Sequence, residues 1–141
     1  MTPAERLQSE LTAGGVERFV ARDYKIGRVV HVVLFRYAAD IPDALRDETV
    51  KRFLALADTP RDGTPYIESI IGGPAMGGEA AEAGFDHGFV VTFASAGDRN
   101  FYVGEPVVSD SRHFDAVHAD FKRFVGPLLA PDGVVVFDIA M

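Results

Sequence analysis

A chain of 141 residues, of which 48% are hydrophobic and 11 are phenylalanine, is long enough for one domain with a packed core. The formal net charge of -7 and the lack of a basic cluster exclude a typical nucleic-acid binder and disfavour an anionic membrane surface as partner. The absence of cysteine excludes disulfides, thiolate nucleophiles and Cys-ligated zinc, and it fits a reducing cytoplasm. We recognise no signal peptide and no apolar run long enough to span a bilayer, so we expect a cytoplasmic protein.

Residues 1–25 are predicted to form an N-terminal helical extension outside the main fold. Residues 3–21 show helical spacing of apolar side chains, and the pair Gly14-Gly15 should divide them because glycine weakens a helix interior. The main domain is expected over residues 26–141. It begins with a strand at residues 26–37, which are rich in β-branched side chains.

The rest of the chain alternates strand and helix patterns. An amphipathic helix is predicted over residues 39–58, with Asp40 as its N-cap and a proline in the first turn. There follow a loop, a second strand, a glycine-rich connection, a third strand, a short helical turn, a second long helix, a turn and a last strand. We expect them, in this order, at residues 59–65, 66–71, 72–84, 87–93, 97–102, 111–128, 131–133 and 134–139. The glycine-rich connection matches no phosphate-binding motif.

The resulting order, β-α-β-β-α-β, predicts a ferredoxin-like α+β fold with both long helices on one face of an antiparallel sheet. The first strand is apolar on both sides, because Val30, Val32 and Leu34 oppose the face that carries His31. Two helices cover only one face, so the other face needs cover as well. We therefore expect a homodimer with two sheets face to face, a dimeric α+β barrel. The competing explanation is that the N-terminal helix covers this face.

Three of the four histidines are expected in the layer between the sheet and its helices. His31 lies on the first strand, His87 on the third strand, and His118 in the apolar stripe of the second helix. A partly buried histidine is usually a hydrogen-bonded core residue, but three in one apolar layer indicate a functional site. The predicted ligand pocket contains these histidines and the apolar residues beside them, Val33, Phe35, Phe89, Val91 and Phe121.

Acid–base chemistry suits this site better than metal binding or nucleophilic catalysis. His113 and His118 are five residues apart and do not share a helical face, and no H-E-x-x-H motif is present, so we expect no metal. No serine lies in a nucleophile motif. General acid–base catalysis needs an imidazole and an orienting partner, and the phenol of Tyr102 is a candidate partner. The alternative role of Tyr102 is to anchor a helix end.

Five segments together resemble the stress-responsive A/B barrel (Dabb) family, part of the dimeric α+β-barrel superfamily. They are VVHVVLFRY in the first strand, GFDHGFVVTF entering the third, NFYV, FDAVHADFKRFVGPLL in the second helix, and the closing VVVFDI. The resemblance covers residues 28–138. It implies the ferredoxin-like protomer and the face-to-face dimer that the strands also predict.

The resemblance also implies roles for individual residues. A polyketide cyclase of the family closes a linear polyketide by aldol condensation, with a His–Tyr pair and no cofactor. Its histidine ends an H-P-A-H stretch where this chain has DAVH, which implies that His118 is the base and Tyr102 its partner. His31 and His87 match histidines that line the pocket of that cyclase.

Two departures from the cyclase pattern leave a second candidate for the functional histidine. Asp115 and Ala116 replace the first His and the Pro of H-P-A-H. The segment that separates Tyr102 from His118 is also longer, and it contains His113.

The leading hypothesis is a homodimer that binds a small, largely apolar, polyketide-like molecule and acts on it without a cofactor, as a cyclase-like or lyase-like enzyme. The second is a non-catalytic stress-response or accessory protein in which the histidines are structural. The third is a cofactor-free or haem-dependent monooxygenase, since other branches of the superfamily perform such chemistry.

Overall fold

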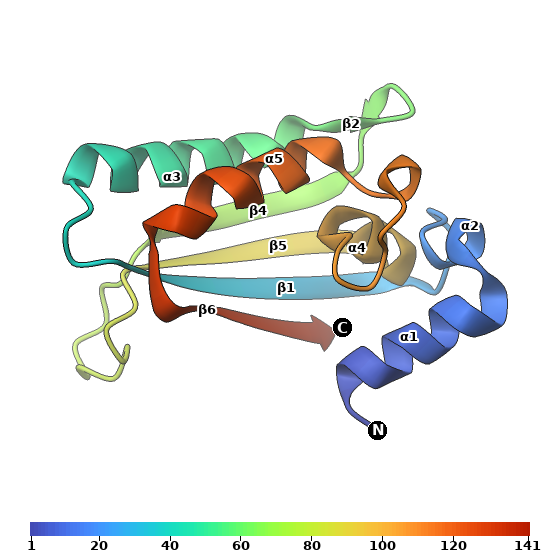
Figure 1. Cartoon of the computed structure of the whole chain (residues 1–141), viewed down its shortest axis with the longest axis horizontal. Helices are drawn as coiled ribbons and strands as arrows, with labels where there is room; N and C mark the ends of the chain where they lie inside the picture. Colours follow the sequence, from blue (N-terminus) through green and yellow to red (C-terminus); the bar gives the residue numbers. More distant parts are fainter.

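The computed structural model describes all 141 residues, and its central feature is a four-stranded antiparallel sheet with the order β4–β5–β1–β6 (Figure 1). The strands are β1 (Ile26–Tyr37), β4 (Ile67–Pro74), β5 (His87–Ser95) and β6 (Leu129–Ala140). A separate two-stranded hairpin, β2 (Pro60–Arg61) and β3 (Thr64–Pro65), precedes β4. The predicted ferredoxin-like α+β fold is confirmed.

Two long helices, α3 (Asp43–Ala55) and α5 (Ala116–Val125), cover one face of the sheet (Figure 1). A shorter helix, α4 (Ala96–Val103), follows β5 directly and contacts the end of β1. The predicted N-terminal extension consists of α1 (Pro3–Gly14) and α2 (Val16–Phe19), divided at Gly15 as expected. Single 3-10 turns complete the fold at Leu56–Asp58, Ser111–His113 and Gly126–Leu128.

The core lies between the sheet and its two long helices. Alternate residues of β1 from Val29 to Tyr37 are at most 7% exposed, and Phe89 of β5, opposite Val33, is 1% exposed. The ring of Phe53 from α3 stacks on Phe89 with 4.0 Å between ring centroids. The face of β1 that carries His31 is therefore the helix-facing side, as predicted.

The outer face of the sheet has no cover within the chain. Phe137 of β6 is 64% exposed and Ile71 of β4 is 66% exposed, although both side chains are large and apolar. The N-terminal extension does not reach this face, because its Leu7 and Leu11 pack against a separate cluster of Phe19, Val20 and Val108. The explanation in which the N-terminal helix covers the outer face is therefore excluded.

The starts of both long helices differ from the predictions. The helix expected to be capped by Asp40 begins at Asp43 with Pro42 in the N-cap position, because the residue before a proline is held in an extended conformation. The second helix was expected from residue 111 but begins at Ala116. Asp115 is the N-cap there, and its carboxylate accepts hydrogen bonds from the backbone N–H groups of the first turn.

Two segments expected to be irregular are part of strands. The predicted loop at residues 59–65 contains the β2–β3 hairpin, which turns at Gly63 with a φ of 85°. The predicted turn at residues 131–133 lies inside β6, where Asp132 adopts a φ of 55° and the pairing with β1 shifts register. A single residue with positive φ therefore bends β6 without ending it.

Asp115 joins the start of α5 to the strand layer. One carboxylate oxygen accepts the N–H of Val117 at 2.9 Å and that of His118 at 3.0 Å. The other oxygen accepts the buried hydroxyl of Tyr66 at 2.6 Å. The same carboxylate thus caps α5 and satisfies a phenol that has no other partner.

We predict that Asp115→Ala lowers the free energy of unfolding by about 2–4 kcal/mol, because it removes an N-cap and leaves the Tyr66 hydroxyl buried without an acceptor. Chemical denaturation measures the change. Asp120→Ala is the matched control, since Asp120 is exposed on the same helix and should cost less than about 0.5 kcal/mol. Equal losses for the two variants would contradict the role of Asp115.

Candidate functional site

A cavity of about 430 Å³ lies between the sheet and α5, within the size range of small-molecule sites. Its walls are mostly apolar, with two histidines, one tyrosine and one lysine among them. Of the residues expected in the pocket, those that line it are His31, Val33, Phe35, Tyr102, His118 and Phe121. Phe89 and Val91 lie below this lining, at 1% and 0% exposure, and belong to the packed core.

His87 lies outside this cavity. It pairs in register with Phe35, whereas His31 pairs with Val91, so about 13 Å of strand separates the two histidines. The Nδ1 atom of His87 is 2.9 Å from the hydroxyl of Tyr37, and burial lowers the pKa of this imidazole. The structure therefore brings together His31 and His118 but not the third histidine expected with them. Sequence alternation identified the face correctly but not the position along the strand.

His113, the alternative functional histidine, also lies away from the cavity. It ends the 3-10 turn Ser111–His113, and its Nε2 atom is 3.9 Å from Asp110. It is absent from the cavity wall, so the longer segment before α5 does not bring a second imidazole to the site.

His118 is held in one orientation by two contacts with α4. Its Nδ1 atom is 2.6 Å from the backbone carbonyl oxygen of Tyr102, so Nδ1 carries the proton and donates it. Its ring stacks on the ring of Tyr102, with 3.7 Å between centroids and 12° between planes. Burial lowers the pKa of His118 to about 3, and the ammonium of Lys122 acts in the same direction, while the carbonyl hydrogen bond opposes the change. The imidazole is therefore neutral at physiological pH.

The phenol of Tyr102 does not hydrogen-bond to His118, because the two rings are stacked. Tyr102 is 1% exposed, and its hydroxyl is the only fully buried side-chain polar atom without a hydrogen-bond partner. Burial raises the pKa of Tyr102 far above its usual value, so the hydroxyl stays protonated. A buried hydroxyl that has no acceptor lowers the stability of the folded protein.

His31 is oriented by the carboxylate of Asp138, which no sequence motif marks as part of the site. Asp138 lies directly opposite His31 on β6, and its Oδ1 atom is 2.6 Å from Nδ1 of the imidazole. Arg99 of α4 donates to the other oxygen of Asp138, also at 2.6 Å. Burial raises the pKa of Asp138, but the bonds from His31 and Arg99 outweigh it and hold the pKa below its usual value. The signal in the sequence that could have identified Asp138 is that it is the only acidic residue in VVVFDI. Its place opposite His31 follows only from the strand register.

Both imidazoles of the site present a free Nε2 atom. In His31 and in His118 the Nδ1 atom is engaged, and Nε2 has no partner within the chain. Neither Nε2 is among the fully buried atoms without a partner, so each retains contact with open space. Since both residues line the cavity, this space is available to a ligand.

Lys122 adds a cation to the cavity wall. Its ammonium donates to the backbone carbonyl oxygens of Val103 at 2.5 Å and Glu105 at 3.1 Å, and burial lowers its pKa. No group of three histidine or acidic side chains is placed to hold a metal ion. None of the helices has the length and apolar character needed to cross a membrane.

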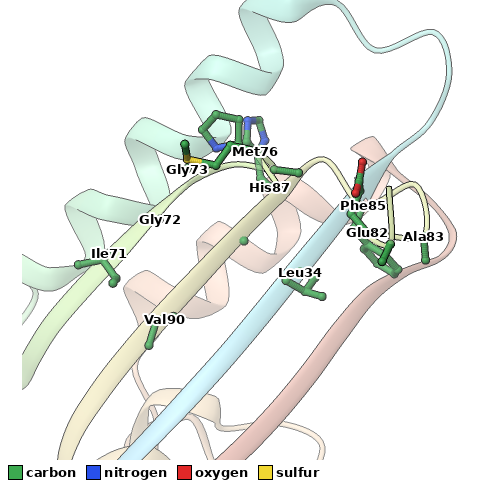
Figure 2. A pocket seen from close by; sticks show the side chains of 14 residues that line it. Leu34, Ile71, Gly72, Gly73, Met76, Glu82, Ala83, Phe85, His87 and Val90 are labelled. Atoms are coloured by element: carbon green, nitrogen blue, oxygen red, sulfur yellow. The ribbon is translucent and has the colours of Figure 1, made fainter. Parts of the chain in front are cut away.

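A second hollow, of about 700 Å³, lies on the outer face of the sheet (Figure 2). Leu34, Ile71 and Val90 project into it from three strands, and Phe85 lies beside it on the connection between β4 and β5. It contains no pair of titratable groups that bond to each other. We therefore place the candidate site in the cavity between the sheet and α5.

Comparison with known proteins agrees with this fold. A hydroxynitrile lyase from Passiflora edulis has a TM-score of 0.64 at 19% identity, over 82% of this chain and 94% of the lyase. A dimeric ferredoxin-like protein of unknown function from Jannaschia sp. CCS1 has a TM-score of 0.61 at 18% identity, over 82% of this chain and all of the other. An Arabidopsis thaliana protein has a TM-score of 0.60 at 23% identity, over 79% and 92%.

None of the curated proteins matches the sequence. The model of the stress-responsive A/B barrel domain, in contrast, matches residues 29–141. This range includes β4, β5, β6 and all of β1 except its first three residues. The match covers the cavity, both of its histidines and the Asp138 carboxylate. The chain therefore belongs to the stress-responsive A/B barrel family.

Proposed function

We propose that the protein is a homodimer in which each protomer binds a small, largely apolar carbonyl compound and performs cofactor-free acid–base chemistry on it. The observation that carries this proposal is the pair of imidazoles with fixed Nδ1 partners and free Nε2 atoms at one apolar cavity. Pockets of this kind, apolar with a few convergent polar groups, are typical of small-molecule sites.

The homodimer is supported by the outer face of the sheet. The exposed side chains Ile71, Val135, Phe137 and Ile139 form one apolar surface, which water contacts unfavourably. A second copy of the same surface is its simplest cover, since an isologous interface is self-complementary. Structures with similar folds from Jannaschia sp. CCS1 and Thermobifida fusca are described as dimeric.

We expect the protein to sediment with twice the mass of one chain at micromolar concentration, and Phe137→Glu to sediment as one chain, because a buried unpaired carboxylate would oppose the interface. Analytical ultracentrifugation measures both. Val117→Glu, which changes a half-exposed apolar residue on α5, is the control and should remain dimeric. A wild-type monomer would contradict the proposal.

The chemistry divides between the two histidines. His31, whose Nδ1 atom is held by the Asp138 carboxylate, is the general base, and its free Nε2 atom receives the proton. His118 stays neutral and accepts a hydrogen bond from a ligand hydroxyl or an enol. The ring and backbone carbonyl of Tyr102 orient His118, whereas its hydroxyl is fully buried and does not reach a ligand in the cavity. Removal of a proton next to a carbonyl needs a base, and a neutral imidazole beside that base can bind the enol that forms.

A non-catalytic binding protein is the second candidate. The pKa of His118, lowered to about 3 by burial, favours a fixed hydrogen-bond acceptor over a proton carrier. In that case the cavity would bind the same class of ligand without turnover.

The two candidates differ in an assay with aryl ketones, β-dicarbonyl compounds and aryl hydroxynitriles, followed by chromatography of substrate and product. If the site is catalytic, at least one class is consumed, and His31→Gln and His118→Gln each lower kcat/KM by about 10²–10⁴-fold. His113→Gln is the control, because His113 lies outside the cavity, and it should retain turnover. Binding without consumption of any class would reject catalysis and favour the second candidate.

The low pKa of His118 also predicts how stability depends on pH. An unfolded histidine takes up a proton near pH 6.5, whereas folded His118 does so only near pH 3, so its contribution is complete above pH 7 and declines as the pH falls. The loss is about 1.4 kcal/mol per pH unit below 6.5, or about 2 kcal/mol at pH 5. Denaturation at pH 7 and pH 5 should show this loss in the wild type and a smaller one in His118→Gln. The same loss in both would contradict the neutral state of His118.

A further inference from the structure

The N-terminal extension contributes a wall to a second, smaller cavity beside the candidate site. This recess has a volume of about 100 Å³ and is closed on one side by Leu7 of α1 and Phe19 of α2. It shares three lining residues with the larger cavity, namely His31, Val103 and Val136. These three residues therefore form a boundary that the two cavities share. Figure 1 shows α1 beside the C-terminal end of β6, where the recess lies.

The polar groups around the recess are already bonded to one another. Arg99 donates to Asn100 at 2.9 Å and to Asp138 at 2.6 Å. Asn100 donates in turn to the backbone carbonyl of Phe19 at 2.9 Å, and Asp138 is 2.6 Å from His31. Because these polar groups bond to one another, a ligand in the recess would mainly contact apolar side chains. These are Leu7, Phe19, Val103, Val107 and Val136. Among the lining residues named here, only the Nε2 atom of His31, which borders the larger cavity as well, is left free, so a short alkyl group fits the rest of this surface better than a polar group.

The position of α1 is fixed by contacts one turn beyond Leu7. Glu10 accepts the hydroxyl of Tyr24 at 2.5 Å and pairs with the ammonium of Lys25 at 2.8 Å. Leu11 packs against the cluster of Phe19, Val20 and Val108. The match to the family begins at residue 29, beyond both helices of the extension. The wall of the recess is therefore an addition of this chain to the shared fold.

We infer that α1 and α2 form a subsite for the alkyl end of the ligand, and that Leu7 determines how long this end can be. The inference rests on the proposed function, because the ligand's carbonyl group is placed at the histidines of the larger cavity. The alkyl group then passes His31 and ends against Leu7. A ligand of one aromatic ring, a carbonyl and a short unbranched chain has the required order of groups.

The test uses the series acetophenone, propiophenone, butyrophenone and valerophenone, with binding measured by calorimetry. In the wild type the affinity should rise about fourfold for each added methylene and then level off when the recess is full. In Leu7→Ala, which enlarges the recess, the affinity should level off only at a longer alkyl chain. Leu7→Phe, which fills the recess, should remove the gain from added methylenes while the affinity for acetophenone changes less than twofold.

Leu11→Ala is the matched control, because Leu11 belongs to the same helix and the same cluster but does not line the recess. It should leave the dependence on chain length unchanged, and circular dichroism checks that every variant is folded. If acetophenone binds but neither Leu7 variant changes this dependence, the subsite is rejected and the proposed function stands. If no member of the series binds the wild type, the proposed function fails and the subsite fails with it.

Discussion

The register of β1 between its two neighbours determines most of this structure. As a central strand it pairs with β5 on one side and β6 on the other, so each residue from Val29 to Phe35 has an opposite residue on both. A shift by one residue would exchange the two faces and turn His31 towards the outside. In the observed register His31 faces the helices and lies directly opposite Asp138. The core, the outer apolar surface and the candidate site all follow from this pairing.

Much of the fold could be predicted from local patterns. Alternation along β1 identified the buried face, and glycine at position 15 divided the extension where expected. The helix starts were less predictable, since Asp40 and Asp115 are both acceptable N-caps in sequence and only the proline after Ile41 distinguishes them. Local preference identifies candidate caps, but the neighbouring backbone decides between them.

The candidate site was predicted only in part, because its assembly depends on contacts between distant segments. The predicted strand face of His31 and the predicted helix stripe of His118 were sufficient to place these two residues together. They were insufficient for His87, whose distance along the strand depends on register, and for Arg99, whose role depends on where α4 meets β6. Strand period gives the side of a sheet, whereas the position along it comes from pairing that no local pattern encodes.

Asp138 has a further consequence for β6 itself. This strand is at the edge of the sheet, and five of its residues, Val134, Val135, Val136, Phe137 and Ile139, are large, apolar and at least 38% exposed. Natural proteins discourage such edges from joining with one another by placing an inward-pointing charge on them, and Asp138 is such a charge. Any change at this carboxylate therefore alters colloidal behaviour as well as the imidazole beside it. Self-association of the polypeptide into fibres or precipitates would be the first sign of its loss.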